Sequence, residues 1–406
     1  MVIYYYMGYN SIKGTSKEDF MFKTDVEKLK ELGASITVRE VYQQPKLWEE
    51  VFQIYEENLL KIENFLDLVS KDGDKVKVIF TGAGTSAYVG DIIERQLKKI
   101  KNRSFDFEAV ATTDLVSNPY DFLKEDERTL LVSFARSGNS PESLKAVELA
   151  NQIVKEIHHL AITCAKEGKL AVGLKGNAND MVLLMPELSN DQGFAMTGSF
   201  TCMLLMTELI FDNTLSMEEK KEKIEKIVRL GNEVIDREDE IQKIIDQDFN
   251  RVVYLGSGSI GAFTREAQLK ILELTAGRIA TCFDTSMGFR HGPKSFVDEK
   301  TLVFDFISNN EYTKLYDLDI LHEVYSNGIA RDVIGISHGE VEGEFTKFAL
   351  KKESELEDIF LVFPYAIFAQ TVSLMASLKV NNRPDTPSKT GTVNRVVKGV
   401  VIHPYK

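Results

Sequence analysis

Two segments far apart in the chain share one pattern. Val78–Ala87 reads VIFTGAGTSA and Val253–Ala262 reads VYLGSGSIGA, and each is an apolar strand that passes through glycines into a helix. Short, nearly continuous apolar stretches alternate with amphipathic segments after both of them, as in parallel sheets that helices cover on both faces. The repeat therefore predicts an α/β protein of two similar units.

Each unit is predicted to contain a five-stranded parallel sheet flanked by helices. The strands expected in the first unit are Lys77–Thr81, Phe105–Val110, Thr129–Phe134, His159–Thr163 and Met181–Leu184. Those expected in the second unit are Arg251–Leu255, Arg278–Phe283, Thr301–Phe306, Asp332–Ser337 and Ile359–Phe363. The helices between them are expected at Ser86–Lys99, Pro141–Val154, Ala195–Phe211, Phe263–Thr275, Lys314–Asn327 and Tyr365–Leu378.

The remaining segments complete a predicted domain plan. Residues 1–45 form an N-terminal extension, and the first unit, residues 46–215, opens with a long amphipathic helix from Pro45 to Val69. Residues 216–247 form a charged helical connector, interpreted as a solvated or partner-facing helix. The second unit spans residues 248–380. Residues 381–406 contain three of the nine prolines and are predicted to be an extended C-terminal tail.

Composition limits the classes of partner. The net charge of −13 argues against nucleic acid and against an anionic membrane surface, but a local loop can still bind a phosphorylated substrate. No stretch reaches the roughly 18 apolar residues of a membrane span. Cys164, Cys202 and Cys282 lack disulfide or zinc spacing, so they are predicted to be reduced core residues of a cytoplasmic protein without a bound metal.

The stretch Leu130–Ser143, LLVSFARSGNSPES, predicts an anion site in the first unit. An apolar strand ends in a loop of hydroxyl groups, and Ser140 and Pro141 suit the N-cap and the first position of a helix. Free N–H groups and the helix dipole at such a terminus attract a phosphate, and a glycine at 138 lets the backbone approach it. The alternative is an ordinary capped βα turn.

In the second unit, Gly256, Gly258 and Gly261 match the dinucleotide-binding fingerprint, with Asp284 as the candidate ribose ligand. A nicotinamide-dependent dehydrogenase is therefore an alternative. Against it, the corresponding glycines of the first unit run directly into Thr85 and Ser86, whose hydroxyls suit a single phosphate better than a pyrophosphate.

A charged stripe lies inside an apolar helix of the second unit. Glu266, Lys270 and Glu273 share one helical face, and His291 follows in a glycine-rich loop. A loop histidine near a carboxylate can transfer protons close to neutral pH. The stripe is equally typical of a salt-bridged face in solvent, and its position before the histidine loop favours the catalytic interpretation.

These motifs together resemble tandem sugar-isomerase (SIS) domains, in which each unit is a flavodoxin-like three-layer sandwich. GAGTSA at 82–87 and FARSGNSPES at 134–143 are similar to phosphate-contacting loops of such domains. The stripe with His291-Gly-Pro, and the tail segment NRVVK ending at Lys398, resemble the isomerase half of glucosamine-6-phosphate synthase. That synthase has a glutaminase domain with an N-terminal cysteine, whereas no cysteine precedes Cys164 in this sequence. The resemblance therefore implies that free ammonia, and not glutamine, is the nitrogen species of the reaction. The RSGNSPES loop and the GTVNRVVKGV tail are similar to the AgaS family of galactosamine-6-phosphate deaminases.

The resemblance implies a reaction and its residues: galactosamine 6-phosphate and water give tagatose 6-phosphate and ammonia, without a cofactor. Glu273 is the implied proton-transfer base, oriented by Lys270 and Glu266, while His291 opens the sugar ring and Lys398 lies near the carbonyl. The implied substrate-binding residues are Gly84, Thr85, Ser86, Arg136, Ser137, Gly138, Asn139, Ser140 and Thr197. One phosphate site per chain is expected, and a histidine donated by a neighbouring subunit implies a homodimer or homotetramer with a shared active site.

Two further functions fit the same sequence. The proton shuttle also serves an aldose–ketose isomerase acting on a neutral sugar phosphate, such as tagatose 6-phosphate. SIS modules also occur as sugar-phosphate sensors, which need the serine loops but not Glu273, His291 and Lys398 together.

Overall fold

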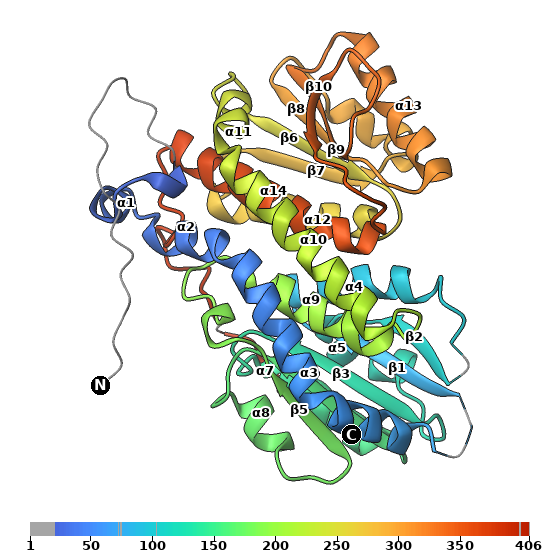
Figure 1. The fold of residues 1–406 in the computed structure, drawn as a ribbon. Helices are drawn as coiled ribbons and strands as arrows, with labels where there is room; N and C mark the ends of the chain where they lie inside the picture. Colours follow the sequence, from blue (N-terminus) through green and yellow to red (C-terminus); the bar gives the residue numbers. More distant parts are fainter. Residues whose placement is uncertain (1–20, 72, 74, 103, 398, 406) are drawn as a thin grey trace.

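The computed structural model describes residues 21–71, 73, 75–102, 104–397 and 399–405. Figure 1 shows two sheets at opposite ends of the molecule with a layer of long helices between them. The C-terminal tail leaves the second unit and runs along the first. The two predicted units are therefore real, and their helices pack on each other.

The first sheet contains the five predicted strands, all parallel, in the order β2-β1-β3-β4-β5. They are β1 (Val76–Thr81), β2 (Phe105–Ala109), β3 (Thr129–Ala135), β4 (Ile157–Thr163) and β5 (Asp180–Leu184). All seven residues of β3 are buried, as expected for a central parallel strand.

The second sheet repeats this order, β7-β6-β8-β9-β10 when read from the corresponding edge. Its strands are β6 (Arg251–Gly256), β7 (Ala280–Thr285), β8 (Thr301–Phe306), β9 (Asp332–His338) and β10 (Thr346–Leu350). The fifth strand is thus β10, and the predicted strand Ile359–Phe363 is wrong. That stretch belongs to helix α14 (Asp358–Lys379), which is apolar and buried on every side from 358 to 377, so its sequence carries no helical period.

Helix α14 lies in the helical layer and contacts several other helices along its length. It packs against α10 (Met217–Asp236), α11 (Glu238–Ile245) and α12 (Gly258–Leu274). By length and composition it could cross a membrane, but its apolar window lies entirely inside the protein. It is the central core helix of the second unit.

The predicted solvated connector is also corrected. The connector helix α10 places Ile224, Ile227, Leu230 and Val234 in the core, where α10 packs against α3 (Gln44–Val69) and α14. The many charged residues of this segment conceal a regular apolar stripe that buries one face of the helix.

The described part of the N-terminal extension is helical. It forms η1 (Met21–Lys23), α1 (Val26–Leu32) and α2 (Ser35–Tyr42). The other helices are α4 (Thr85–Leu97), α5 (Thr112–Ser117), α6 (Pro119–Phe122), α7 (Pro141–Ile153), α8 (Lys169–Leu174), η2 (Glu187–Ser189), α9 (Gly198–Phe211), η3 (Gly288–Arg290), η4 (Pro293–Phe296) and α13 (Glu311–Asn327).

Candidate active site

The site lies at the topological switch point of the first sheet, where the strand order reverses on either side of β1. β1 pairs with β2 on one side and with β3 on the other, so the loops that leave β1 and β3 diverge at their carboxyl ends. Such a switch point is where open α/β sheets bind ligands. The loops concerned are 82–84, which leads into α4, and 136–140, which leads into α7.

Both loops present helix N-termini to the site. Gly84 and Gly138 have φ angles of 58° and 63°, a left-handed conformation that favours glycine. Gly84 is the N-cap of α4, and Ser140 is the N-cap of α7 without a capping bond from its side chain. The Ser140 hydroxyl and the two helix dipoles can therefore serve an anion.

A cavity of about 200 Å³ lies between these loops. Of the predicted residues it is lined by Gly84, Thr85, Ser86, Arg136, Ser137, Gly138, Ser140 and Glu273. Ser143 and Met196, which were not predicted, also line it, together with the tail segment 393–397, most of which was predicted through its resemblance to an active-site segment. The spacing of Ser143, three residues after Ser140, places it on the same helical face and is the signal that could have found it.

Two predicted substrate residues do not line the cavity. The Asn139 side chain donates to the Ser137 carbonyl and accepts the N–H of Lys169, so it holds the loop in shape. Thr197 is buried and donates its hydroxyl and N–H to Asp191. Both support the site from behind its wall.

Arg136 binds protein groups at the cavity. Its guanidinium donates to the carbonyls of Gly193 and Phe194 at 3.3 and 3.1 Å, and to that of Arg395 in the tail at 2.5 Å. Burial lowers its pKa, although an arginine remains charged at neutral pH. Arg136 thus joins a loop and the tail while placing a positive charge in the wall.

The charged stripe of α12 points into the protein, which excludes the solvent-face interpretation. Lys270 Nζ lies 2.6 Å from Glu273 Oε2 and 3.3 Å from Glu266 Oε1, and it donates to Thr85 Oγ1 at 3.1 Å. The side chains of Lys270 and Glu266 are 1% exposed, whereas that of Glu273 is 22% exposed and reaches the cavity. Lys270 therefore connects the second unit's carboxylates to the first unit's α4.

Burial and charge set the protonation of this cluster. Burial raises the pKa of Glu266 to about 7, against the opposite pull of Lys270. Burial also opposes the charge of Lys270, but the carboxylates of Glu266 and Glu273 outweigh it and raise the pKa of the ammonium group. The lysine is thus held charged beside Glu273.

The last two predicted catalytic residues are His291 and Lys398. His291 is exposed in the loop between η3 and η4 and is not part of the wall. Lys398 lies outside the described residues, next to the tail segment 393–397 that does line the wall.

The corresponding loops of the second unit bind a carboxylate of the chain itself. Asp317 on α13 accepts the hydroxyls of Ser257 and Ser286 at 2.6 Å each, and the N–H of Ser308 at 2.9 Å. These donors come from the loops after β6, β7 and β8. The Asp317 carboxylate thus occupies the loop donors that a bound phosphate would need. This supports the expectation of one phosphate site per chain, and it weakens the dinucleotide-binding alternative for the second unit.

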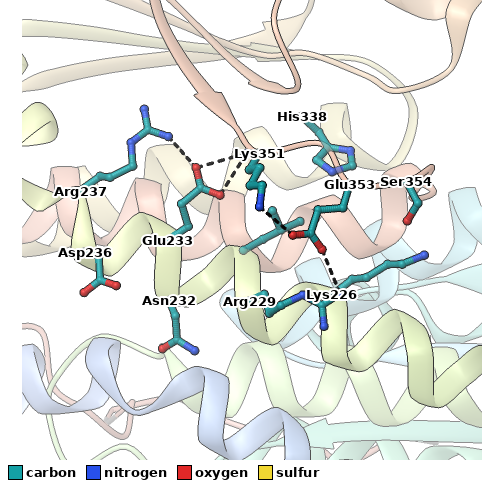
Figure 2. Close-up of a pocket in the computed structure, with 11 residues that line it drawn as sticks. Lys226, Arg229, Asn232, Glu233, Asp236, Arg237, His338, Lys351, Glu353 and Ser354 are labelled. Atoms are coloured by element: carbon teal, nitrogen blue, oxygen red, sulfur yellow. Dashed lines mark hydrogen bonds and ion pairs between the residues drawn. The ribbon is translucent and has the colours of Figure 1, made fainter.

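A second cavity, of about 450 Å³, lies beside α10 and the end of β9 (Figure 2). Five of its charged side chains pair with one another: Glu233 with Arg237 at 2.8 Å, and Glu353 with Arg229 and Lys351 at 3.4 and 3.1 Å. Such mutual pairing does not provide the convergent donors of the serine-lined cavity, which we therefore regard as the active site.

Comparison with known proteins agrees with this geometry. The SIS domain family matches residues 74–212, the first unit. The D-galactosamine-6-phosphate deaminase AgaS of Escherichia coli is 41% identical over 373 residues, covering 91% of this chain and 96% of the relative. The chain belongs to the AgaS family. It is therefore a member of a family of sugar-phosphate enzymes.

Solved structures extend the family likeness to both units. A crystal structure from Clostridium novyi NT has a TM-score of 0.90 and 45% identity, covering 95% of this chain and 99% of its own. The tagatose-6-phosphate ketose/aldose isomerase from Escherichia coli has a TM-score of 0.83 and 39% identity, covering 91% and 96%. The likeness to solved structures thus covers both units and the helical layer between them.

Glu266→Gln should change the pH dependence of stability. The pKa of Glu266 is about 7 in the folded chain and 4.5 for an ordinary glutamate, so the folded state binds more protons between these values. The free energy of unfolding should therefore fall as pH rises from 4.5 to 7, by up to roughly 3 kcal/mol from this group. Urea unfolding at pH 5 and pH 8 should show that the variant lacks this fall.

The matched control is Glu49→Gln, an exposed glutamate of α3, which should keep the wild-type pH dependence. An unchanged pH dependence in Glu266→Gln would mean that the buried carboxyl is ionised throughout and that Lys270 dominates its environment.

Proposed function

We propose that this chain is a deaminase that converts D-galactosamine 6-phosphate and water into D-tagatose 6-phosphate and ammonia. The observation that carries the proposal is that Glu273, a carboxylate held by a buried lysine, opens into the same cavity as two serine-lined helix N-termini. A base at one end and an anion site at the other suit a sugar 6-phosphate. A relative that matches over 91% of this chain and 96% of its own length bears the name of this activity.

The 6-phosphate lies at the loops of the first unit in this proposal. Ser86, Ser137 and Ser140 donate hydroxyl groups to it, together with N–H groups at the start of α4 and α7. Hydrogen bonds to a charged group are stronger than neutral ones, so these contacts fix the ligand's orientation. The reacting carbons then lie toward Glu273.

Glu273 moves one proton in the proposed reaction. In the open-chain aldehyde it removes the proton from C2; this electron pair forms the C1=C2 bond of an enolamine, while the C1=O π pair moves to O1, which takes a proton from solvent, balanced by the amine proton that is lost when the imine forms. Return of the proton to C1 gives a C2 imine, water adds to C2, and ammonia leaves the resulting carbinolamine to yield the ketose. Lys270 orients Glu273 during both proton transfers, since its ammonium is 2.6 Å away.

His291 and Lys398 complete the proposed site from elsewhere. Arg290 and Lys294 pair with Glu323 of α13 and thereby hold the exposed His291 outward on the protein surface. We assign ring opening to His291 of a neighbouring copy in a homodimer or homotetramer, and a cationic role near the carbonyl to Lys398. The three cysteines are free, which fits a cytoplasmic location.

An aldose–ketose isomerase is the second candidate, because the Escherichia coli relative of known structure is named as one. Proton transfer between C2 and C1 is common to both reactions, and only the deaminase releases ammonia. A sensor without catalysis is disfavoured, because a binding site alone does not need the costly burial of Glu266 and Lys270.

An ammonia-release assay tests the proposed function. Galactosamine 6-phosphate should give ammonia and tagatose 6-phosphate, and the 6-phosphates of glucosamine and N-acetylgalactosamine serve as comparison substrates. The acetylated sugar should be inert, since its nitrogen is an amide. Interconversion of tagatose 6-phosphate with an aldose phosphate, without ammonia release from any amino sugar, would establish the isomerase instead.

Ser137→Ala tests the anion site. The variant loses one hydrogen bond to a charged group, so KM should rise about ten- to a hundredfold, or roughly 1.5–3 kcal/mol, with a smaller change in kcat. Ser117→Ala, at an exposed serine on α5, is the matched control and should keep the wild-type KM. A KM that does not change in Ser137→Ala would remove this loop from the phosphate site.

A further inference from the structure

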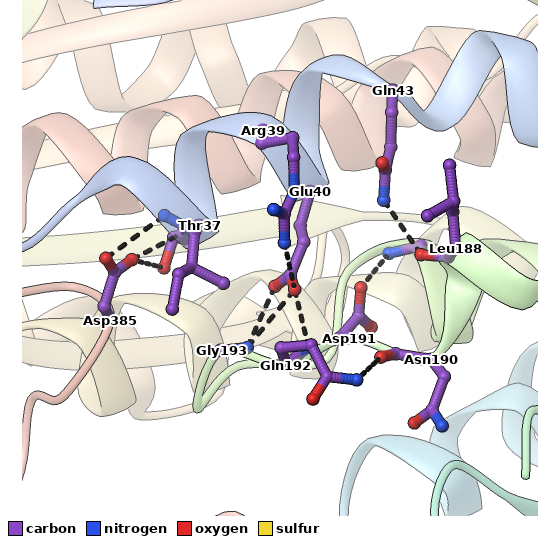
Figure 3. Close-up of polar contacts among 12 residues, drawn as sticks. Thr37, Arg39, Glu40, Gln43, Leu188, Asn190, Asp191, Gln192, Gly193 and Asp385 are labelled. Carbon is purple, nitrogen blue, oxygen red and sulfur yellow. Dashed lines mark hydrogen bonds and ion pairs between the residues drawn. The ribbon is translucent and has the colours of Figure 1, made fainter. Parts of the chain in front are cut away.

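Helix α2, in the N-terminal extension, holds the loop that precedes α9 (Figure 3). Glu40 is 1% exposed, and its Oε1 accepts the N–H groups of Gln192 and Gly193 at 2.5 and 3.2 Å. The loop's next anchor is Asp191, which accepts N–H and hydroxyl groups at the start of α9. The loop is therefore fixed between α2 and α9.

The same loop holds the C-terminal tail. Arg395 donates from Nε to the Asp191 carbonyl at 2.7 Å and from its second terminal nitrogen to Asn190 Oδ1 at 2.8 Å. The Arg395 carbonyl in turn accepts from Arg136, which also binds the carbonyls of Gly193 and Phe194. Glu40 and Arg395 thus both bind the short loop 190–193.

The other end of this tail segment rests on α2 directly. Asp385 accepts the N–H groups of Ile36 and Thr37 at 3.1 and 2.8 Å, and the Thr37 hydroxyl at 2.8 Å. These N–H groups belong to the first turn of α2, where a carboxylate also faces the positive end of the helix dipole. Segment 385–395 is therefore anchored to α2 at both ends, directly at Asp385 and through the loop 190–193 at Arg395. Residues 393–397, at the end of this segment and just after it, line the cavity.

The burial of Glu40 is energetically expensive. Burial, with Asp191 nearby, raises its pKa to about 7. A buried carboxyl group at this position lowers the stability of the fold relative to an apolar residue. The hydrogen bonds that it accepts from two loop N–H groups offset part of this cost. Its role is thus to hold the loop in one position.

We propose that α2 positions the C-terminal tail over the sugar-phosphate cavity, and that Glu40, Asp385 and Arg395 are positioning residues for the reaction. The inference rests on the proposed function of that cavity. Arg395 is itself part of the wall formed by 393–397, whereas Glu40 and Asp385 act on that wall through α2 and the loop 190–193.

Two measurements on the full-length protein test this. Hydrogen exchange of the tail amides reports anchoring without any substrate, and kcat and KM for galactosamine 6-phosphate report its consequence. Arg395→Ala, at a half-buried side chain, should keep the fold, raise exchange across 386–397 about tenfold or more, and lower kcat at least about tenfold. Exchange in α7 should not change.

Glu40 gives a second variant pair. Glu40→Ala should reproduce both effects of Arg395→Ala, while Glu40→Gln keeps an acceptor oxygen and should recover most of kcat. Arg383→Ala is the control, because this exposed tail arginine contacts Lys30 of α1 and neither α2 nor the loop. It should match wild type in both measurements.

Unchanged tail exchange in Arg395→Ala would overturn the anchoring. Raised exchange with kcat and KM within twofold of wild type would overturn the positioning role. If wild-type protein releases no ammonia from galactosamine 6-phosphate, the proposed function fails, and the exchange data alone still decide whether α2 anchors the tail.

Discussion

The buried contact of Lys270 with Glu266, Glu273 and Thr85 is the interaction on which the site depends. Burying an ammonium group is costly unless it is paired and hydrogen-bonded, and here both conditions are met within 3.3 Å. Because Thr85 belongs to the first unit and the carboxylates to the second, the same contact fixes how the units meet. It also fixes Glu273 opposite the serine loops. The Lys270 contact therefore accounts both for the packing of α12 on α4 and for the position of the proposed base.

The two units share a strand order but have diverged at the same place. In the first, loop hydroxyls remain available to a ligand at the switch point; in the second, Asp317 accepts two serine hydroxyls and a backbone N–H. Substitution of an internal carboxylate for an external phosphate keeps the loop geometry and removes a binding site. In the proposed reaction, the second unit instead contributes the base, Glu273, from α12.

Much of this was predictable because it depends on local pattern. The β3–α7 loop with Ser137 and Ser140 and the charged stripe of α12 follow from strand runs, helix caps and helical periodicity. The errors arose where periodicity is absent or masked, as in the wholly apolar α14 and the charge-rich α10. The hydrogen bonds of Glu40 to the loop before α9 could not be predicted in this way. They join residues about 150 positions apart in the sequence, which only tertiary packing brings together. The roles of His291 and Lys398 remain predictions.

The central claim is that Glu273 transfers the proton at C2, and Glu273→Gln tests it most directly. The nearly isosteric amide can still accept from Lys270, so the fold and substrate binding should be retained. Exchange of the C2 hydrogen of galactosamine 6-phosphate with solvent deuterium, followed by NMR, should fall about 100- to 10,000-fold, and ammonia release should fall with it. Deuterium exchange at the wild-type rate in Glu273→Gln would mean that another residue is the base and would contradict the account.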